Sequence, residues 1–314
     1  MKPVIVVGSG AWGKNLVRNF HELESLAGVV ELDPGLRQQL ARQYPDVAVF
    51  DATDAALATD AAAIVVATPA PTHYALAQAA LAAGKDVFVE KPMTLTAADA
   101  QALATEADQQ GRILMVGHLL LYQPAIQWMQ TYLASGQAGP VHHIATHRLN
   151  LGRVRTTENV WWSLAPHDVS IILALLGNPE LVSVQAVGHH RLQAEIADEV
   201  HVDLAFASGQ TAHLHCSWQW PIKQRGLVAI AQRQMLTYDE IQQSVVLHNS
   251  HIDAHLAAIS LGTDAIDIAT DQPLKLECQH FLDCLDSRQT PRSDGWNGAA
   301  VVRILEKVQE ALDG

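Results

Sequence analysis

The sequence predicts an α/β protein of two parts: a doubly wound parallel sheet, then an α+β domain with a largely antiparallel open sheet. Three observations predict this fold. Apolar strand-like runs alternate with helical segments through the first 119 residues, as a parallel sheet requires. A glycine-rich turn follows the first run. Between residues 182 and 247, strand-like runs succeed one another without helices. We therefore expect domains at 1–119 and 120–314, with the C-terminal helices packing back towards the first.

The glycine turn lies between the β-branched run Val4–Val7 and a helical segment at 15–20, and it reads Gly-Ser-Gly-Ala-Trp-Gly. The first glycine permits a tight turn, the second lets the backbone approach a pyrophosphate, and the third allows close packing of helix on strand. Phosphate would lie at the amino terminus of the helix. The residues expected to contact the dinucleotide here are Gly8, Gly10, Ala11, Trp12 and Gly13.

A carboxylate follows the second predicted strand, Gly28–Leu32. Asp33 stands at the distance expected for a side chain that binds the adenosine ribose hydroxyls. It would repel a 2′-phosphate, so the sequence favours NAD over NADP, although Arg37 one turn later keeps NADP open. Asp33 precedes a proline and could also cap the next helix.

The alternation continues to residue 117. Thr68 and Pro69 end one strand in a rigid turn, beside the place where a nicotinamide would lie. Glu90, Lys91 and Pro92 end the next, at the sheet edge where such folds bind ligands. A lysine there is either solvated or catalytic. Further strands are expected near Val47–Phe50, Ala62–Ala67, Asp86–Val89 and Ile113–Gly117, and helices near Ala52–Ala58, Thr72–Ala83 and Thr96–Gln110.

These residues, with His73 and the segments 84–92, 277–284 and 291–295, resemble the glucose-fructose oxidoreductase, inositol dehydrogenase and rhizopine catabolism (Gfo/Idh/MocA) family. The resemblance implies a Rossmann domain that binds NAD and a cis peptide bond between Lys91 and Pro92. It also implies cofactor contacts from the two strand-end turns and the following helices. Those residues are Arg37, Thr68, Pro69, His73, Glu90, Lys91 and Pro92.

The second half begins with a linking helix at Tyr122–Ser135. A helix expected at Pro166–Leu176 would pack on one face of the antiparallel sheet. The resemblance implies that the other face meets a second copy, in a homodimer or homotetramer. The strands of this sheet are expected at Val182–Gly188, Val200–Ala207, Thr211–Trp218, Leu227–Ala231 and Ser244–Leu247.

No acidic residue lies between Asp108 and Glu158, although the chain carries a formal charge of −13. This stretch contains Arg148, Arg153 and Arg155, whose guanidinium groups suit phosphate or carboxylate. Pairing of these cations with acids elsewhere in the fold is the alternative.

The segment 161–168 places an imidazole just behind a proline. The resemblance implies that His167 faces Lys91 and removes the alcohol proton during hydride transfer, while Lys91 stabilises the developing alkoxide. Many relatives have an aspartate four residues before this histidine, where this chain has Ser163. Either Asp168 orients the imidazole instead or the pair is incomplete.

The segments 150–155, 161–168 and 217–221 most resemble the branch of this family that oxidises UDP-activated amino sugars. The implied reaction is oxidation of the 3-hydroxyl of UDP-N-acetylglucosamine, whose ketone a pyridoxal-phosphate aminotransferase would convert to a 3-amino sugar for lipid A or O-antigen. Alternatives are the matching uronate, an inositol or monosaccharide, and a non-catalytic NAD-binding regulator. The expected substrate contacts are Lys91, Tyr122, Arg148, Asn150, Arg153, Arg155, Trp162 and His167.

Several other classes are disfavoured. The acidic charge argues against a nucleic-acid partner. No apolar run reaches the roughly 18 residues of a membrane helix, and no signal peptide is evident, so we expect a cytoplasmic enzyme. The three cysteines form no Cys-x-x-Cys pair. Of the sixteen histidines, His213 with His215 on a strand and His251 with His255 on a helix could chelate. Neither pair has an evident third ligand, so no metal is expected.

Overall fold

The computed structural model describes residues 2–269 and 271–314, which form two compact units. The first unit contains the chain up to Leu119 together with Gln272–Val302. The second contains Leu120–Asp271 and Arg303–Gly314. Helix α9 (Gly295–Asp313) therefore begins in the first unit and ends in the second.

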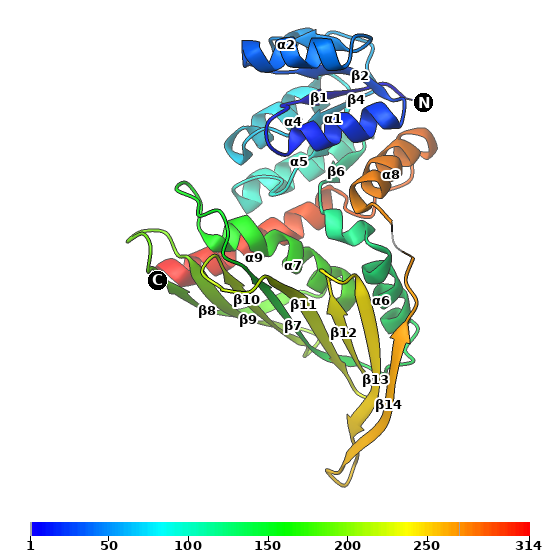
Figure 1. Cartoon of the computed structure of the whole chain (residues 1–314), viewed down its shortest axis with the longest axis vertical. Helices are drawn as coiled ribbons and strands as arrows, with labels where there is room; N and C mark the ends of the chain where they lie inside the picture. The colour runs from blue at the N-terminus through cyan, green and yellow to red at the C-terminus, as the bar shows by residue number, and fades with distance from the viewer. Residues whose placement is uncertain (1, 270) are drawn as a thin grey trace. The chain divides into compact units, whose positions relative to one another are not determined.

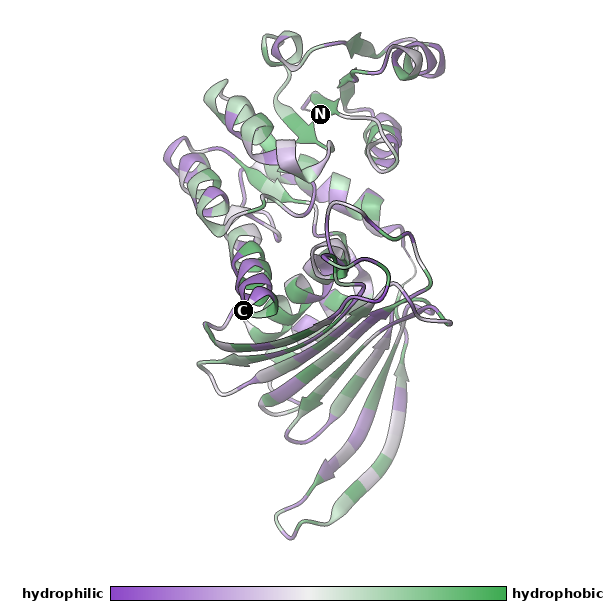
Figure 2. Cartoon of the chain, turned by 90° about the vertical axis from the view of Figure 1, so that its left-hand side faces the viewer, coloured by the Kyte–Doolittle hydropathy of each residue, from purple (hydrophilic) through white to green (hydrophobic). Residues whose placement is uncertain are grey.

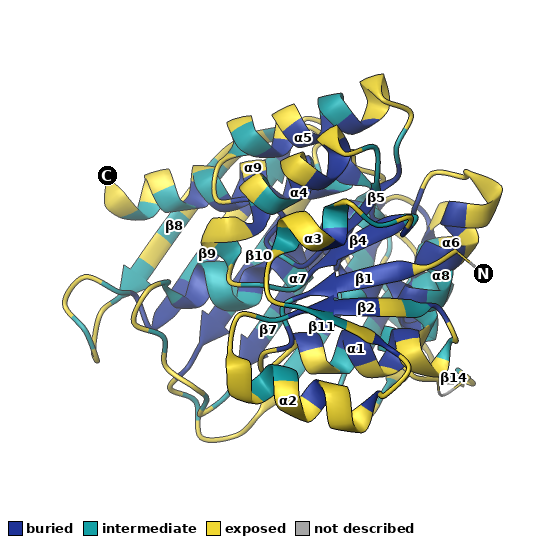
Figure 3. Ribbon diagram, turned by 90° about the horizontal axis from the view of Figure 1, so that it is seen from above, coloured by how far each residue is buried: buried dark blue, intermediate teal, exposed yellow. Residues whose placement is uncertain are grey.

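The sheet of the first unit has six strands in the order β3-β2-β1-β4-β5-β6, and all its neighbouring pairs are parallel. Helices lie on both faces, so the central strands are buried throughout, as the dark ribbons β1 and β4 show (Figure 3). The predicted doubly wound parallel fold is confirmed. The strands are β1 (Val4–Val7), β2 (Leu26–Val30), β3 (Ala48–Phe50), β4 (Ala63–Val66), β5 (Asp86–Val89) and β6 (Leu114–Val116).

Helix α5 (Ala97–Gln109) begins at a capping side chain. The side chain of Thr96 accepts a hydrogen bond from the backbone N–H of Asp99, 3.1 Å away, as the predicted N-cap would. Phe281 of α8 packs edge-on against Phe88 of β5, with ring centroids 5.6 Å apart, so a distant segment of the chain completes this core. The helices are α1 (Gly13–Glu22), α2 (Pro34–Gln43), α3 (Thr53–Leu57), η1 (Ala70–Thr72), α4 (His73–Ala82), α5 (Ala97–Gln109) and α8 (Pro273–Ser287).

The sheet of the second unit has eight strands in the order β14-β13-β12-β11-β7-β10-β9-β8. All pairs are antiparallel except β7 with β10, so the predicted open, largely antiparallel sheet is confirmed. Hydrophilic and hydrophobic residues alternate along its strands (Figure 2). The strands are β7 (Val141–Leu149), β8 (Leu181–His189), β9 (Glu199–Phe206), β10 (Thr211–Ser217), β11 (Gln224–Ala231), β12 (Met235–Asp239), β13 (Ser244–Ile252) and β14 (Ala258–Ile266).

Helices α6 (Pro124–Ala134) and α7 (Val160–Leu176) lie on one face of this sheet (Figure 1), and α7 contacts β7, β9 and β10. The turn η2 (Leu119–Tyr122) precedes them. Among the described residues, no helix is both long and apolar enough to cross a membrane.

The expected start of α7 at Pro166 is wrong. The helix begins at Val160, where the side chain of Asn159 accepts a hydrogen bond from the N–H of Trp162. A proline inside a helix removes one backbone hydrogen bond, at a cost of about 3 kcal/mol. Burial of Trp161, whose indole N–H donates to the carbonyl of Leu305 over 3.0 Å, offsets that cost. His167 consequently lies in the interior of the helix rather than near its start.

Candidate active site

The glycine turn has the shape that a dinucleotide requires. Gly8 has a φ of +93°, which favours glycine, and a Cβ on Gly13 would lie 2.1 Å from the carbonyl oxygen of Gly8. A Cβ on Gly10, in contrast, would meet no atom within 4 Å. Open space at the second glycine, beside the amino terminus of α1, fits the close approach of a pyrophosphate.

Glu31 is the carboxylate that directly follows β2. Its Oε2 accepts from the backbone N–H of Ser9 at 3.0 Å and from the Ser9 hydroxyl at 2.5 Å. Its Oε1 accepts from the N–H of Asp33 at 3.0 Å. Partial burial raises the pKa of Glu31, but these hydrogen bonds outweigh it and lower the pKa below its ordinary value. Glu31 therefore holds a negative charge against the glycine turn.

Asp33, which the sequence analysis selected for the ribose, caps α2 by accepting from the N–H of Leu36 over 2.8 Å. The sequence prediction ended this strand at Leu32, whereas β2 ends at Val30, so Glu31 directly follows the strand. Arg37 donates from Nη1 to the backbone carbonyls of Glu31 and Leu32, at 2.9 and 2.8 Å. These bonds hold the guanidinium on the backbone of the β2–α2 connection.

The turn after β5 contains the Lys91–Pro92 peptide bond in the cis form, as expected. Glu90 is 7% exposed, and its Oε1 accepts from the indole N–H of Trp12, 2.5 Å away. Its Oε2 accepts from the backbone N–H of Lys91 at 3.2 Å. Burial raises the pKa of Glu90 to about 7, although the bond from Trp12 and the charge of Lys91 oppose it. Glu90 thus links the glycine turn to the lysine turn.

His73 joins the ends of β4 and β5. Its Nδ1 lies 2.8 Å from the carbonyl oxygen of Pro92, and its Nε2 lies 2.8 Å from that of Thr68. The imidazole is buried, and burial lowers its pKa against the effect of both carbonyls. His73 therefore holds the two strand-end turns, which the resemblance assigned to the cofactor, at a fixed separation.

Two buried titratable residues of this unit, His118 and Glu277, were not among the predicted site residues. Among the described residues, neither ring nitrogen of His118 has a hydrogen-bond partner, and burial with the nearby charge of Lys91 lowers its pKa to about 3. Glu277 of α8 is fully buried, and both of its carboxylate oxygens likewise lack a described partner. Burial and the charge of Glu90 raise its pKa. No local motif marks either residue, because burial depends on tertiary packing.

In the second unit, Arg148 is enclosed rather than exposed. It is 2% exposed, and its Nε and Nη2 donate to Asp168 Oδ2 and Oδ1, each over 2.9 Å. Nη2 also donates to Glu240 Oε2 over 2.8 Å. The guanidinium is bonded to carboxylates within the unit, so Arg148 is not assigned as a substrate ligand. Both oxygens of Asp168 accept from Arg148, so Asp168 is not assigned the role of orienting His167.

The loop after β7 carries the other two arginines. Arg153 is exposed, and Arg155 lies 3.6 Å from Glu158 in a half-exposed pair. Asn150 binds the carbonyl of Ser217 through its backbone N–H, and its buried Oδ1 has no partner among the described residues. Through Arg153 and Arg155, the loop presents cations to solvent.

Two further residues were predicted to contact substrate. Tyr122 is buried. Trp162 is half-buried, and its indole N–H donates to Gln309 over 3.1 Å.

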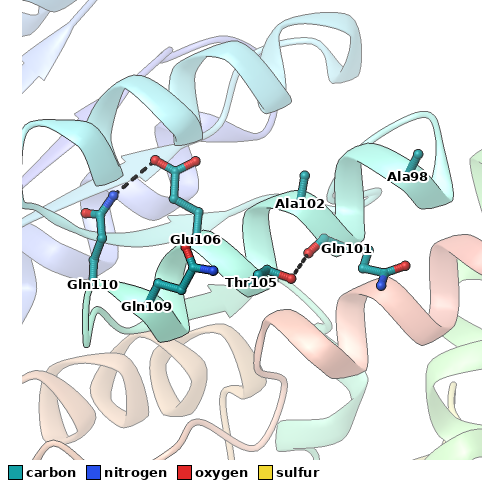
Figure 4. A pocket seen from close by; sticks show the side chains of 7 residues that line it. All are labelled: Ala98, Gln101, Ala102, Thr105, Glu106, Gln109 and Gln110. Atoms are coloured by element: carbon teal, nitrogen blue, oxygen red, sulfur yellow. Dashed lines mark hydrogen bonds between the residues drawn. The ribbon is translucent and has the colours of Figure 1, made fainter.

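An open hollow on α5 contains none of the predicted site residues (Figure 4). Thr105 Oγ1 donates to the carbonyl of Gln101 over 2.7 Å, and Gln110 donates to Glu106 over 3.1 Å. Two of its polar side chains are thus bonded to their own helix, and Glu106 also accepts from Gln78 of α4 over 3.5 Å. The lining residues are Ala98, Gln101, Ala102, Thr105, Glu106, Gln109 and Gln110.

A Rossmann sheet with this glycine turn is typical of proteins that bind a dinucleotide. Residues 2–118 match the model of the oxidoreductase family with an NAD-binding Rossmann fold, and residues 126–236 match the GFO/IDH/MocA C-terminal domain. The chain belongs to the Gfo/Idh/MocA oxidoreductase family, its cofactor is NAD, and its relatives include dehydrogenases.

Two curated relatives bear on the substrate. UDP-N-acetylglucosamine 3-dehydrogenase of Acidithiobacillus ferrooxidans is 26% identical over 98% of this chain and 96% of its own length. Its solved structure has a TM-score of 0.88, covering 99% of this chain and 98% of that one. Inositol 2-dehydrogenase 1 of Saccharopolyspora erythraea is 34% identical, over 66% of this chain and 64% of its own length. GenD2 from gentamicin A biosynthesis, solved with NAD, shares the fold, with a TM-score of 0.84 at 24% identity over 99% of this chain and 94% of that one.

Proposed function

We propose that this chain oxidises the 3-hydroxyl of UDP-N-acetylglucosamine to the 3-keto sugar, with NAD as the hydride acceptor. The observation that carries the proposal is similarity to the A. ferrooxidans enzyme over nearly the whole of both chains, whereas the inositol dehydrogenase matches about two thirds of each. The exposed Arg153 and the half-exposed Arg155 support an anionic substrate, because guanidinium groups bind diphosphates well.

In the first unit, we assign cofactor binding to the glycine turn and to Glu31, with Asp33 holding the helix start beside it. When bound there, NAD would supply the acceptor for the hydride that leaves the carbinol carbon. We further assign contacts with the nicotinamide half to the turns at Thr68 and Lys91 that His73 joins. The other members of this proposed set are Ala11, Trp12, Pro69, Glu90 and Pro92.

We assign the proton chemistry to Lys91 and His167. As the carbon–hydrogen bond breaks, the hydroxyl proton passes to the imidazole of His167, which acts as general base. The ammonium of Lys91 donates a hydrogen bond to the same oxygen and stabilises its developing negative charge. The products are ketone, NADH and one proton. We also assign sugar contacts to Tyr122, Asn150 and Trp162.

The ketone is a substrate for transamination, so we propose that a pyridoxal-phosphate aminotransferase consumes it in 3-amino sugar biosynthesis. We also propose that the chain forms a homodimer or homotetramer through its eight-stranded sheet. Size-exclusion chromatography with light scattering tests the assembly, and a monomeric mass would contradict it.

A substrate panel tests the proposed function. Purified chain with NAD is mixed with UDP-N-acetylglucosamine, its uronate or myo-inositol, and a 3-keto-sugar aminotransferase with glutamate draws off ketone. We expect NADH with the first sugar. Turnover with the uronate alone would replace the substrate and make Arg153 or Arg155 a carboxylate ligand. Turnover with inositol alone would favour an inositol dehydrogenase, an alternative that the similarity to inositol 2-dehydrogenase 1 supports. No turnover at all would favour a non-catalytic NAD-binding protein.

A further inference from the structure

Histidines gather on the face of the eight-stranded sheet that points away from α7. His201 of β9 stands directly opposite His215 of β10, and Glu199 lies two residues before His201. Residues two apart in a strand share a face, so all three side chains project from the same side. Their neighbours Val200, Val202, Leu214 and Cys216 alternate with them and are buried on the other side.

Both imidazoles approach the same carboxylate oxygen, Oε1 of Glu199. Nε2 of His215 lies 2.9 Å from Oε1 of Glu199, and Nε2 of His201 lies 3.3 Å from the same oxygen. The two imidazole rings stack with centroids 4.0 Å apart and planes 19° apart. All three potential ligand atoms lie within 4.8 Å of one another.

These separations approach those of a first-row metal site. In a tetrahedral zinc site with bonds of about 2.1 Å, neighbouring ligand atoms lie about 3.4 Å apart. Two of the three separations, 2.9 and 3.3 Å, are already close to that value. We propose that Glu199, His201 and His215 bind one divalent transition-metal ion of the zinc class, which cross-links β9 to β10.

Neighbouring charged side chains orient the Glu199 carboxylate and leave its Oε1 available to a metal ion. Arg191 donates from Nη1 to Oε2 of Glu199 and lies 3.7 Å from Asp198 Oδ1, which leaves Oε1 directed at the two imidazoles. Such outer-sphere bonds orient metal ligands. The Arg191 side chain is 51% exposed, so solvent screens its repulsion of a cation. The neighbouring His213 is bonded separately, through Nδ1 to Asp203 at 2.9 Å.

The donor set selects the metal. Imidazole with one carboxylate suits zinc, nickel and copper, whereas calcium and magnesium prefer oxygen ligands throughout. Thiols do not compete, because Cys216, Cys278 and Cys284 are all buried. The site also differs from both pairs considered in the sequence. The other two ligands, Glu199 and His201, come from the adjacent strand, which spacing along the chain does not reveal. His251 lies on strand β13, so the expected helix face with His255 is wrong.

Isothermal titration calorimetry with Zn²⁺ tests the proposal, on the full chain without an added histidine tag. We expect one saturable ion per chain, in whatever assembly the protein forms, and a rise in its thermal midpoint. Loss of even an outer-sphere partner typically costs about 10- to 100-fold in affinity, so His201→Ala and His215→Ala should each weaken binding at least about tenfold. His143→Ala is the matched control, because His143 lies on the same sheet but bonds to Thr211. It should bind zinc as the wild type does.

Glu199→Gln keeps the shape of the side chain and should also weaken binding. Should an alanine variant not fold, His201→Gln replaces it, with the metal-free thermal midpoint as the check on folding. Zinc affinity in the His201→Ala/His215→Ala double variant equal to that of the wild type would overturn the proposal, as would the absence of saturable binding to the wild type. The measurement requires no turnover, so its failure and that of the proposed enzyme activity are distinguishable.

Discussion

Arg148 and Asp168 form two parallel hydrogen bonds, Nε to Oδ2 and Nη2 to Oδ1, each 2.9 Å long and buried within the second unit. The same guanidinium binds Glu240. This relationship joins β7 to α7 and occupies an arginine that the sequence had suggested for an anionic substrate.

Arg148→Ala should therefore destabilise the protein by about 3–5 kcal/mol, because it leaves Asp168 buried without its cation, whereas Glu240 keeps Arg225 as a partner. Arg153→Ala, at an exposed position, should change stability by no more than about 0.5 kcal/mol. Urea unfolding followed by circular dichroism measures both. Equal stability of the two variants would contradict the assignment of Arg148 to the fold.

Glu31→Gln should weaken NAD binding about tenfold, because it removes the charge that follows β2. Asp33→Asn should leave NAD affinity nearly unchanged, since asparagine caps a helix as well as aspartate does. Fluorescence titration with NADH gives both affinities. A larger loss in Asp33→Asn than in Glu31→Gln would return the ribose role to Asp33.

Much of the first unit was predictable because its signals are local. Glycine positions, apolar runs and the cap at Thr96 each depend on neighbours in sequence. The choice between Glu31 and Asp33 depended on where one strand ends, and periodicity places such ends only within a few residues. In the second unit, β12 (Met235–Asp239) and β14 (Ala258–Ile266) were not predicted. They lie towards one edge of the sheet, and much of β14 is exposed, so its apolar alternation is weak.

Residues of the candidate site could be predicted only where a local sequence motif marks them. The turn at Lys91 has such a motif, and its cis bond is present. His118 and Glu277 acquire their surroundings from segments far apart in the chain. The pairing of Arg148 with Asp168 and Glu240 spans 20 and 92 residues, so local charge counting could not reveal it.

Lys91→Ala and His167→Asn should each lower kcat by about 10²- to 10⁴-fold, the usual contribution of a positioned proton-transfer group. NAD affinity should stay within about threefold, because the glycine turn and Glu31 remain intact. Steady-state kinetics and NADH titration provide the two readouts. A variant that kept wild-type turnover would remove its residue from the mechanism.

Glu90→Gln should change the pH dependence of stability. Since the pKa of Glu90 is raised to about 7 in the folded state, the protonated group stabilises the fold at low pH. That contribution should be lost progressively as pH rises from about 4.5 to 7, at about 1.4 kcal/mol per unit of pKa shift at most. The stability of wild type minus that of Glu90→Gln should therefore fall between pH 5 and 8. A constant difference across that range would refute the assignment.

The contribution of His118 to stability changes with pH in the opposite direction. Its pKa is lowered to about 3, so its neutral form stabilises the fold above about pH 6.5, and this contribution decreases as pH falls towards 3. The stability of wild type minus that of His118→Gln should accordingly decrease with acidification. Thermal unfolding midpoints from pH 4 to 7 measure it, and a difference that grew on acidification would contradict the buried, neutral imidazole.

The most direct test of the proposed reaction follows the hydrogen on the oxidised carbon. The chain is incubated with NAD and UDP-N-acetylglucosamine carrying deuterium at C3, with the aminotransferase and glutamate present, and the reduced cofactor is analysed by mass spectrometry. We expect one deuterium in each reduced cofactor. Unlabelled NADH would place the oxidation at another carbon, and the absence of reduced cofactor would contradict the proposed dehydrogenase activity itself.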